Sequence, residues 1–401
     1  MESERGHSVT TCECLEDQHW ESLRDLTVVV VTRDRPMEVG RLLRSLANMP
    51  CSVDVYDNGR EAIPRNLRSL SERQTYTYQP ADYPSNLQSA SYRIRTSYVC
   101  MVDDDGLLQP HGVGEALCLL RECREAVAVE GHVANFVRQN GKAFFYLSPE
   151  SIRDAELLVD PITRLAAVMG NFSSNPWYAI HRTESFAQAL LLAGSIEAIS
   201  TSRNVSPQFF VALTAASGPI IKCPRLVGIR EDSLAPHDLD AYNIWCGDWL
   251  ADANFTEQVR EVFSLMRVAL ESLGMSAQEV EDAQTVIRAS IGIHSHPSSA
   301  GRTGRRERIA RLVRGQSLLI RRRRASQQLD FPLDQVDEPV SIVLSDVVTS
   351  GEPSIIEPAA LQWDSRDAQL VMSALGIQEV IVVRRPKDLP GYMSSRTGLS
   401  P

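Results

Sequence analysis

The stretch that decides the fold is Tyr98–Gly106, which runs YVCMVDDDG. The apolar run Tyr98–Val102 leads directly into three aspartates, Asp103, Asp104 and Asp105. A continuous apolar run of this length is typical of a strand that is buried on both faces of a parallel sheet. Adjacent carboxylates repel one another unless a cation lies between them. Ligands of open α/β sheets bind beyond the carboxyl ends of strands, so the triplet is a candidate site. The alternative is a solvated acidic turn, or a helix cap at Asp105.

A second buried run, Leu26–Thr32 (LTVVVVT), opens a βαβ unit. The turn Arg33-Asp34-Arg35-Pro36 follows it, and Pro36 is typical of the first turn of a helix. A short strand at Val53–Tyr56 then stops at Asp57-Asn58-Gly59, a strong turn signal. If both strands are central in the sheet, Thr32 and Asp57 meet the acidic triplet at one edge of it.

Strands and helices alternate over residues 26–130, which predicts an α/β fold with a mostly parallel sheet flanked by helices. The chain after 250 is expected to hold a helical segment and then a small α/β appendage. Strands are expected at Thr75–Tyr78, Ala126–Glu130, Phe144–Leu147, Trp177–Ile180, Ile220–Ile221, Leu226–Ile229, Val340–Leu344 and Val380–Val383. Helices are expected at Ile63–Leu70, Leu87–Arg95, His111–Glu122, Asp160–Met169, Thr183–Ala193, Gln208–Ala216, Phe255–Leu273, Ala277–Ile291 and Ala368–Ala374.

The composition excludes several classes of protein. The 401 residues carry a formal net charge of −10, so general nucleic-acid binding is not expected, because that affinity rests on clustered positive charge. No segment reaches the ~18–20 consecutive apolar residues of a membrane helix, and Met1–Asp25 lacks the apolar run of a secretory signal. The sparse cysteines are typical of reduced core thiols, so we expect a cytoplasmic protein.

The chain has no glycine-rich phosphate loop, so bound phosphates would need a metal ion rather than a nest of backbone amides. A hard divalent cation uses one or two carboxylates together with substrate phosphates. Arg33 or Arg35 can meet a phosphate or stack on a base. Asp57 can accept a hydrogen bond from a nucleobase, or it can be a turn residue only.

These motifs resemble family 2-type glycosyltransferases with the GT-A fold, closest to a bacterial and phage-associated branch of small glycosyltransferase domains. The resemblance rests on TVVVVTRDRP (Thr27–Pro36), on Asp54-x-x-Asp57-Asn58-Gly59 and on YVCMVDDDGLLQP (Tyr98–Pro110). It is clear over residues 26–130 and weaker from 131 to 250, where NPWYAIHR (Asn175–Arg182) and GIRE (Gly228–Glu231) are similar to that branch. Past about residue 330 nothing is recognisable.

The resemblance implies transfer of a sugar, with inversion, from a nucleotide-diphosphate sugar to an acceptor hydroxyl. Thr32 and Asp57 would contact the base, Asp103 would touch the ribose or the sugar, and Asp105 would hold Mn or Mg. Asp104 would assist, and Asp103 belongs to the same metal group. His237 would complete the metal shell, unless it is a surface histidine.

The acidic pair that such enzymes carry on a later helix is not evident, because Ile199–Pro207 contains no acid. Glu197 and Asp232 are therefore the candidates for the catalytic base. Glu231 or Asp232 can equally be a loop acid that pairs with Arg230. Trp245 and Trp249 are interpreted as core residues, with an acceptor-sugar wall as the minority reading.

We expect a polar tail over 1–25, a GT-A-like catalytic domain over 26–250, a helical segment and basic linker over 251–330, and the appendage over 331–401. The first alternative function is a sugar-nucleotidyltransferase, although the turn after Thr32 lacks the glycine-rich loop of that class. The second is a non-catalytic nucleotide-binding or scaffold protein. The acceptor, the donor and the oligomeric state stay open, a homo-oligomer included.

Overall fold

The computed structural model describes residues 19–68, 71–80, 83–139, 142–147, 160–170, 175–200, 202, 205–231, 246–292, 373–375 and 380–382. These residues form one ten-stranded sheet with the order β10-β7-β6-β8-β4-β1-β2-β3, in which β9 pairs with β5 and β6. The strands are β1 (Leu26–Thr32), β2 (Ser52–Asp57), β3 (Gln74–Tyr78), β4 (Tyr98–Asp103), β5 (Gly106–Leu108), β6 (Ala128–Gln139), β7 (Lys142–Leu147), β8 (Ile180–Arg182), β9 (Ile220–Glu231) and β10 (Val380–Val382).

The centre of the sheet is parallel, as its two apolar runs predict. Strand β1 lies between β2 and β4, and all three run in the same direction, as does β3 beyond β2. Side chains of β1 alternate between two cores, since Val28 and Val30 enter one and Val29 enters the other. Burial on both faces explains why the run is continuously apolar. The predicted α/β class with a mostly parallel sheet flanked by helices is confirmed.

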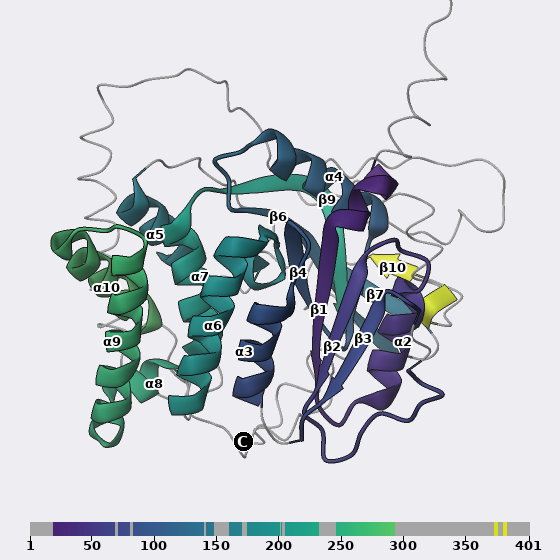
Figure 1. Ribbon diagram of the computed structural model, residues 1–401, viewed down its shortest axis with the longest axis horizontal. Helices are drawn as coiled ribbons and strands as arrows, with labels where there is room; N and C mark the ends of the chain where they lie inside the picture. Colours follow the sequence, from purple (N-terminus) through teal and green to yellow (C-terminus); the bar gives the residue numbers. More distant parts are fainter. Residues whose placement is uncertain are drawn as a thin grey trace, which may run out of the picture.

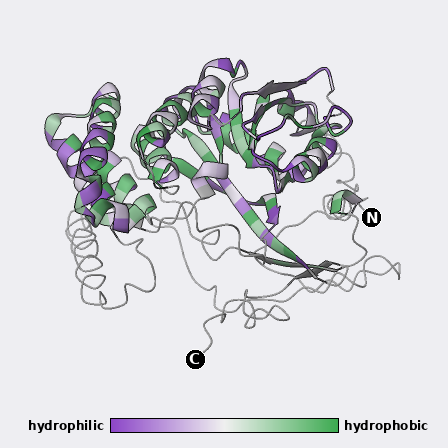
Figure 2. Cartoon of the chain, turned by 90° about the horizontal axis from the view of Figure 1, so that it is seen from below, coloured by the Kyte–Doolittle hydropathy of each residue, from purple (hydrophilic) through white to green (hydrophobic). Residues whose placement is uncertain are grey.

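Helices cover both faces of the sheet (Figure 1). On one face, α2 and α4 complete one core, and on the other, α3, α6 and α7 complete the second. Figure 2 shows the apolar strands enclosed between these helices. The helices are α2 (Pro36–Leu46), α3 (Tyr83–Arg93), α4 (Pro110–Glu122), α5 (Pro161–Gly170), α6 (Thr183–Ile199), α7 (Val205–Ser217), α8 (Cys246–Ala251), α9 (Thr256–Ser272) and α10 (Ala277–Ile291).

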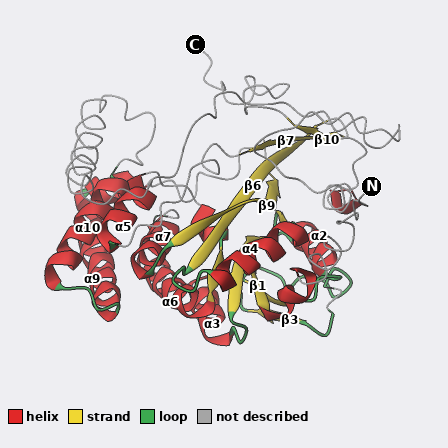
Figure 3. Cartoon of the chain, turned by 90° about the horizontal axis from the view of Figure 1, so that it is seen from above, coloured by secondary structure: helices red, strands yellow, loops and turns green. Residues whose placement is uncertain are grey.

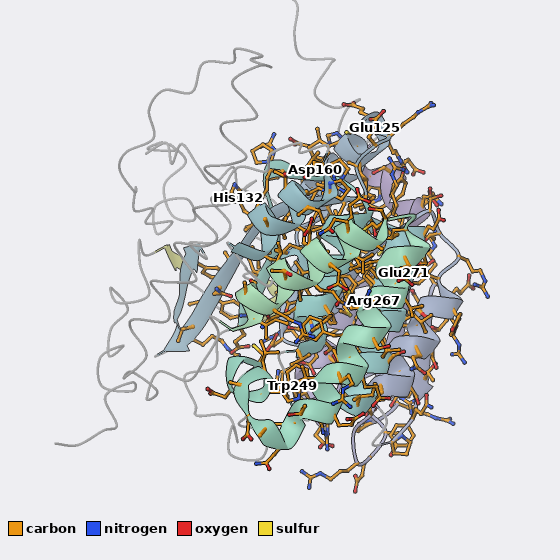
Figure 4. All side chains as sticks on the ribbon, turned by 90° about the vertical axis from the view of Figure 1, so that its left-hand side faces the viewer. Glu125, His132, Asp160, Trp249, Arg267 and Glu271 are labelled. Atoms are coloured by element: carbon orange, nitrogen blue, oxygen red, sulfur yellow. The ribbon has the colours of Figure 1, made fainter. Side chains whose placement is uncertain are left out.

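An outer helical layer packs on α6 and α7. Helices α9 and α10 join the same core as α6 and α7, and α10 begins with a capping box in which Ser276 and Glu279 satisfy each other's backbone amides. Trp249, labelled in Figure 4, is buried on α8, and its indole nitrogen donates to Oε1 of Gln258 at 3.0 Å. Trp249 is thus a core residue, and Trp245 lies outside the described residues.

The second half of the sheet is mixed. Strands β6 and β9 are parallel neighbours that lie side by side in Figure 3. Strands β7 and β8 pair antiparallel with β6. Strand β10 adds to the outer edge of β7, and Leu375 is buried in the core shared with α2 and α4. The described part of the C-terminal appendage therefore extends the main sheet.

Several expected elements differ in the structure. The helix expected at Ile63–Leu70 is wrong in its described part, which consists of turns up to Arg68. Two short strands expected within 220–229 are one strand, β9, with a register shift against β6 between Glu130 and Val133. The strand expected at Trp177–Ile180 begins only at Ile180, after a short 3-10 helix. The strand expected at Val340–Leu344 lies outside the described residues. None of the helices in the described chain is long and apolar enough to cross a membrane.

Candidate functional site

The carboxyl ends of β1, β2 and β4 meet at one edge of the sheet. The sheet register pairs Thr32 with Asp57 and Val31 with Asp103. The Thr32 hydroxyl donates a hydrogen bond of 2.8 Å to Oδ2 of Asp104. The convergence expected from the two apolar runs is therefore present.

Arg35 lies between two carboxylates of the triplet. Its Nη1 donates to Oδ1 of Asp104 at 3.0 Å and to Oδ2 of Asp105 at 2.9 Å. The residue follows Asp34, whose φ of 55° reverses the chain between β1 and α2. In the described part of the chain, an arginine from the first βα turn thus places a positive charge beside these two carboxylates.

Asp103 has a different set of partners. Its Oδ2 accepts a hydrogen bond from the Tyr178 hydroxyl, and that hydroxyl accepts one from Nη1 of Arg230 at 3.2 Å. The Arg230 guanidinium also lies 5.8 Å from the centre of the Tyr178 ring, within cation–π range. The segment NPWY thus places the Tyr178 hydroxyl beside the acidic triplet. Its hydrogen bond fixes the orientation of the Asp103 carboxylate.

Strand β9 reaches the site because it pairs with β5, which directly follows the triplet; Gly106 faces Arg230 in that register. The next residue, Glu231, accepts from Arg41 at 2.7 Å and from Arg138 at 2.6 Å. Arg41 also donates to the backbone oxygen of Asp105 at 3.3 Å. Glu231 therefore pairs with Arg41 and Arg138, not with Arg230, and ties α2 and β6 to the end of β9.

Asp57 is buried, and the turn after β2 together with β3 supplies the partners of its carboxylate. Its Oδ1 accepts from the Gly59 amide at 2.8 Å, and its Oδ2 accepts from the Tyr76 hydroxyl at 2.5 Å and from the Ile63 amide at 3.2 Å. These bonds close the turn after β2. The turn interpretation describes this geometry, while a contact with a base stays a prediction.

Burial disfavours the charged form of two carboxylates of the triplet, Asp104 and Asp105. It raises the pKa of Asp104 to about 7, although Arg35 and Thr32 act in the opposite direction. It also raises the pKa of Asp105, and the nearby Asp103 carboxylate adds to that rise. Added positive charge at this edge would stabilise the charged forms of both carboxylates and lower their pKa values.

The donor atoms of the triplet are chemically compatible with a hard divalent cation. The triplet supplies carboxylate oxygens, the ligand type that Mg²⁺ and Mn²⁺ prefer. Oδ1 of Asp105 is buried and has no hydrogen-bond partner in the described part of the chain. This oxygen is therefore available as a metal ligand. Asp103 lies close enough to influence Asp105 electrostatically. Among the described residues, no group of three or more His, Cys, Asp or Glu side chains is placed so that it could hold a metal ion by itself.

The other candidates are less well placed or undescribed. Glu197 lies in the last turn of α6, and its Oε2 accepts from the Ser206 hydroxyl at 2.6 Å. Arg33 is exposed, and its Nε lies 3.9 Å from Oδ2 of Asp34. Asp232 and His237 lie outside the described residues, so their predicted roles as base and metal ligand stay predictions.

The sequence alone did not indicate the part played by Tyr178, Arg41 and Arg138. Tyr178 falls within the strand expected at Trp177–Ile180, and Arg41 is one of several arginines in the α2 region of the sequence. No local pattern marks them, because each acts through a partner far along the chain. The one available signal was the position of NPWY directly before the short strand β8, which borders β4.

Comparisons with known proteins give a distant structural likeness only. No family model and no curated protein matches the sequence. The structure is similar to a crystal structure of S. aureus TarS residues 1–349, with a TM-score of 0.42 and 13% identity over 66% of this chain and 70% of that one. A second crystal structure of S. aureus TarS gives a TM-score of 0.40 and 14% identity over 66% of this chain and 55% of that one.

Proposed function

We propose that this chain is a metal-dependent glycosyltransferase that moves a sugar from a nucleotide-diphosphate sugar to an acceptor hydroxyl, with inversion. The observation that carries the proposal is the hydrogen bond from Thr32 to Asp104 at the carboxyl edge of two central parallel strands. It joins the first βα turn to the acidic triplet, so one ligand can touch both. Open α/β sheets bind ligands at such an edge.

The proposed roles follow the resemblance and the chemistry of each group. Thr32, Asp57, Arg33 and Arg35 would face the nucleotide, and Asp103 and Asp104 the ribose or sugar. Asp105, with Asp103 and His237, would hold Mn²⁺ or Mg²⁺. A bound divalent cation would supply positive charge for the departing diphosphate. The buried, unpartnered Oδ1 of Asp105 supports that assignment.

Residues of the chain itself would orient the donor-binding carboxylate and deprotonate the acceptor hydroxyl. Tyr178 and Arg230 hold Asp103 in one orientation, which keeps the carboxylate in position for the donor. A general base must lie within hydrogen-bond reach of the acceptor hydroxyl. Glu197 and Asp232 are the proposed bases. Glu197 lies at the end of α6 next to the start of α7, where Ser206 holds its carboxylate.

The experiment is a donor survey. Purified protein is incubated with UDP- and GDP-sugars with and without Mn²⁺, and released nucleoside diphosphate is measured. We expect slow Mn²⁺-dependent hydrolysis that Asp105→Ala abolishes and Glu197→Gln reduces if Glu197 is the base. Asp282→Ala, which removes an exposed carboxylate on α10, is the control and should match the wild type. Full activity of Asp105→Ala would overturn the metal assignment.

A second candidate is a nucleotide-binding protein without transfer chemistry. Arg35 already pairs with two carboxylates of the triplet, an arrangement that can hold a stable site without any metal. Tight binding of UDP or GDP with no turnover of any donor would favour this candidate over the transferase. The sugar-nucleotidyltransferase alternative has no comparable support in the described residues.

A further inference from the structure

Arg35 is held more loosely than Arg41, the arginine that bonds to the backbone of Asp105. Its side chain is 35% exposed, and a single nitrogen, Nη1, serves both Asp104 and Asp105. Its Nε and Nη2 make no hydrogen bond to any described residue. Arg41 is the contrast, because its side chain is 9% exposed and uses two nitrogens, one on Glu231 and one on the backbone of Asp105.

The backbone that carries Arg35 is fixed. Asp34 accepts hydrogen bonds from the Arg60 amide at 2.7 Å and from its Nε at 3.2 Å, and Thr32 accepts one through its backbone oxygen from the Asn58 amide at 3.0 Å. Pro36 starts α2 immediately afterwards. A change at Arg35 is therefore a change of side-chain position over a rigid turn.

Arg35 and a divalent cation would be held by the same carboxylates. Asp105 offers Oδ2 to Arg35 and has Oδ1 buried without a partner. Asp104 offers Oδ1 to Arg35, while its Oδ2 is taken by Thr32. Two positive charges on one carboxylate repel each other, so the guanidinium and the metal cannot both be held at full strength.

We infer that Arg35 is an internal competitor for the metal, and that it couples metal binding to donor binding. Without donor, the guanidinium neutralises Asp104 and Asp105 and weakens metal binding. When metal and donor arrive together, Arg35 leaves the carboxylates and binds the donor's diphosphate, an anion to which its partly exposed guanidinium can donate through Nε and Nη2. The site thereby favours the metal–diphosphate pair over the metal alone. This inference rests on the proposed function.

The coupling has a thermodynamic consequence. A ligand that removes a competitor from a site raises the affinity of that site for the second ligand, and the effect is reciprocal. Metal must then improve diphosphate binding by the same factor as diphosphate improves metal binding. Removing Arg35 must reduce this factor, because it takes away the competitor and the phosphate contact together.

The first arm of the test is Mn²⁺ binding to the full chain without nucleotide, followed through the EPR signal of the free ion. Arg35→Gln should bind Mn²⁺ at least about tenfold more tightly than the wild type, which corresponds to about 1.4 kcal/mol. Arg44→Gln removes the same charge from an exposed position on α2 and should match the wild type. Equal affinity of Arg35→Gln and the wild type would overturn the inference and leave the proposed function standing.

Arg35→Lys separates charge from a merely structural effect. Lysine keeps the competing charge, so this variant should bind Mn²⁺ as weakly as the wild type. If Arg35→Lys instead gains as much affinity as Arg35→Gln, charge competition is refuted. Thermal unfolding midpoints near that of the wild type would show that the variants are folded.

The second arm is calorimetric titration of UDP and of GDP at saturating Mn²⁺. Arg35→Gln should bind the nucleotide at least about tenfold more weakly than Arg44→Gln. Unchanged nucleotide affinity would refute the coupling. If Mn²⁺ binds neither the wild type nor any variant, and Asp105→Ala changes nothing, the metal assignment of the proposed function fails and the inference falls with it.

Discussion

Arg41 of α2 donates a hydrogen bond of 2.7 Å to Glu231 at the end of β9, across 190 residues of chain. This ion pair is largely buried, since the side chains are 9% and 18% exposed. It brings the end of β9 against α2, the helix that follows β1. The acidic triplet lies between them, because Arg41 also holds the backbone of Asp105.

Glu231→Ala should destabilise the fold markedly. Removing one partner of a buried pair leaves an uncompensated charge, so we expect a loss of about 3–5 kcal/mol in the free energy of unfolding. Urea unfolding at pH 7 measures it. Arg138→Ala, which removes the half-exposed partner of the same carboxylate, should cost only about 0–1 kcal/mol. Similar losses for both variants would contradict the assignment of Arg41 as the buried partner.

Tyr178→Phe should also lower stability, by about 1.5–3 kcal/mol, because a hydrogen bond to a charged group is lost. Burial and the Asp103 carboxylate raise the pKa of Tyr178 well above its ordinary value, so its hydroxyl keeps its proton and can donate. Urea unfolding measures the loss. Tyr92→Phe is the matched control, since that ring is 65% exposed, and it should be neutral. A neutral Tyr178→Phe would show that the contact with Asp103 contributes nothing.

Asp105→Ala should remove the Mn²⁺-dependent part of any rise in the unfolding temperature caused by a nucleoside diphosphate. A ligand at about 100 times its Kd stabilises the native state by about 2.7 kcal/mol through mass action. Differential scanning fluorimetry of UDP and GDP, each with and without Mn²⁺, follows this rise. Asp282→Ala should keep the full effect. A Mn²⁺-dependent rise that survives Asp105→Ala would remove this residue from the metal site.

His181 should make the protein less stable in acid. It is buried between Phe186 and Phe210, and its Nε2 donates to the Pro176 carbonyl at 2.9 Å, which leaves Nδ1 bare and buried without a partner in the described chain. Burial lowers its pKa to about 4, partly offset by the Pro176 carbonyl. The unfolded chain binds the proton first, so stability is lost as the pH falls from about 6.5 toward 4, by about 2 kcal/mol at pH 5.

His181→Gln isolates this effect. Asp104 contributes with the opposite sign, because its raised pKa favours the folded state at low pH and that contribution is lost as the pH rises through about 7. Both proteins carry Asp104, so its contribution cancels in their difference. The difference between the unfolding free energies of wild type and variant should shrink between pH 7 and pH 5. A constant difference would show that His181 titrates normally.

Local patterns predicted the elements that depend on short-range physics. The apolar runs predicted β1 and β4, and the periodicity of Ala277–Ile291 predicted α10 with its observed bounds. The helix expected from Ile63 onward failed because contacts from outside the segment decide its shape. The Ile63 amide bonds to Asp57 and Tyr76, which hold the chain in turns.

The sequence by itself determined the parallel centre of the sheet, and with it the meeting of Thr32, Asp57 and the acidic triplet at one edge, because buried strands need unbroken apolar runs and parallel strands end on the same side. Only the tertiary structure decided the partners of each carboxylate. Arg35, Tyr178 and Arg41 reach Asp105, Asp103 and Glu231 across 70, 75 and 190 residues. Such pairs depend on how distant elements pack against one another, and this packing produces no periodic pattern in the sequence of a single chain.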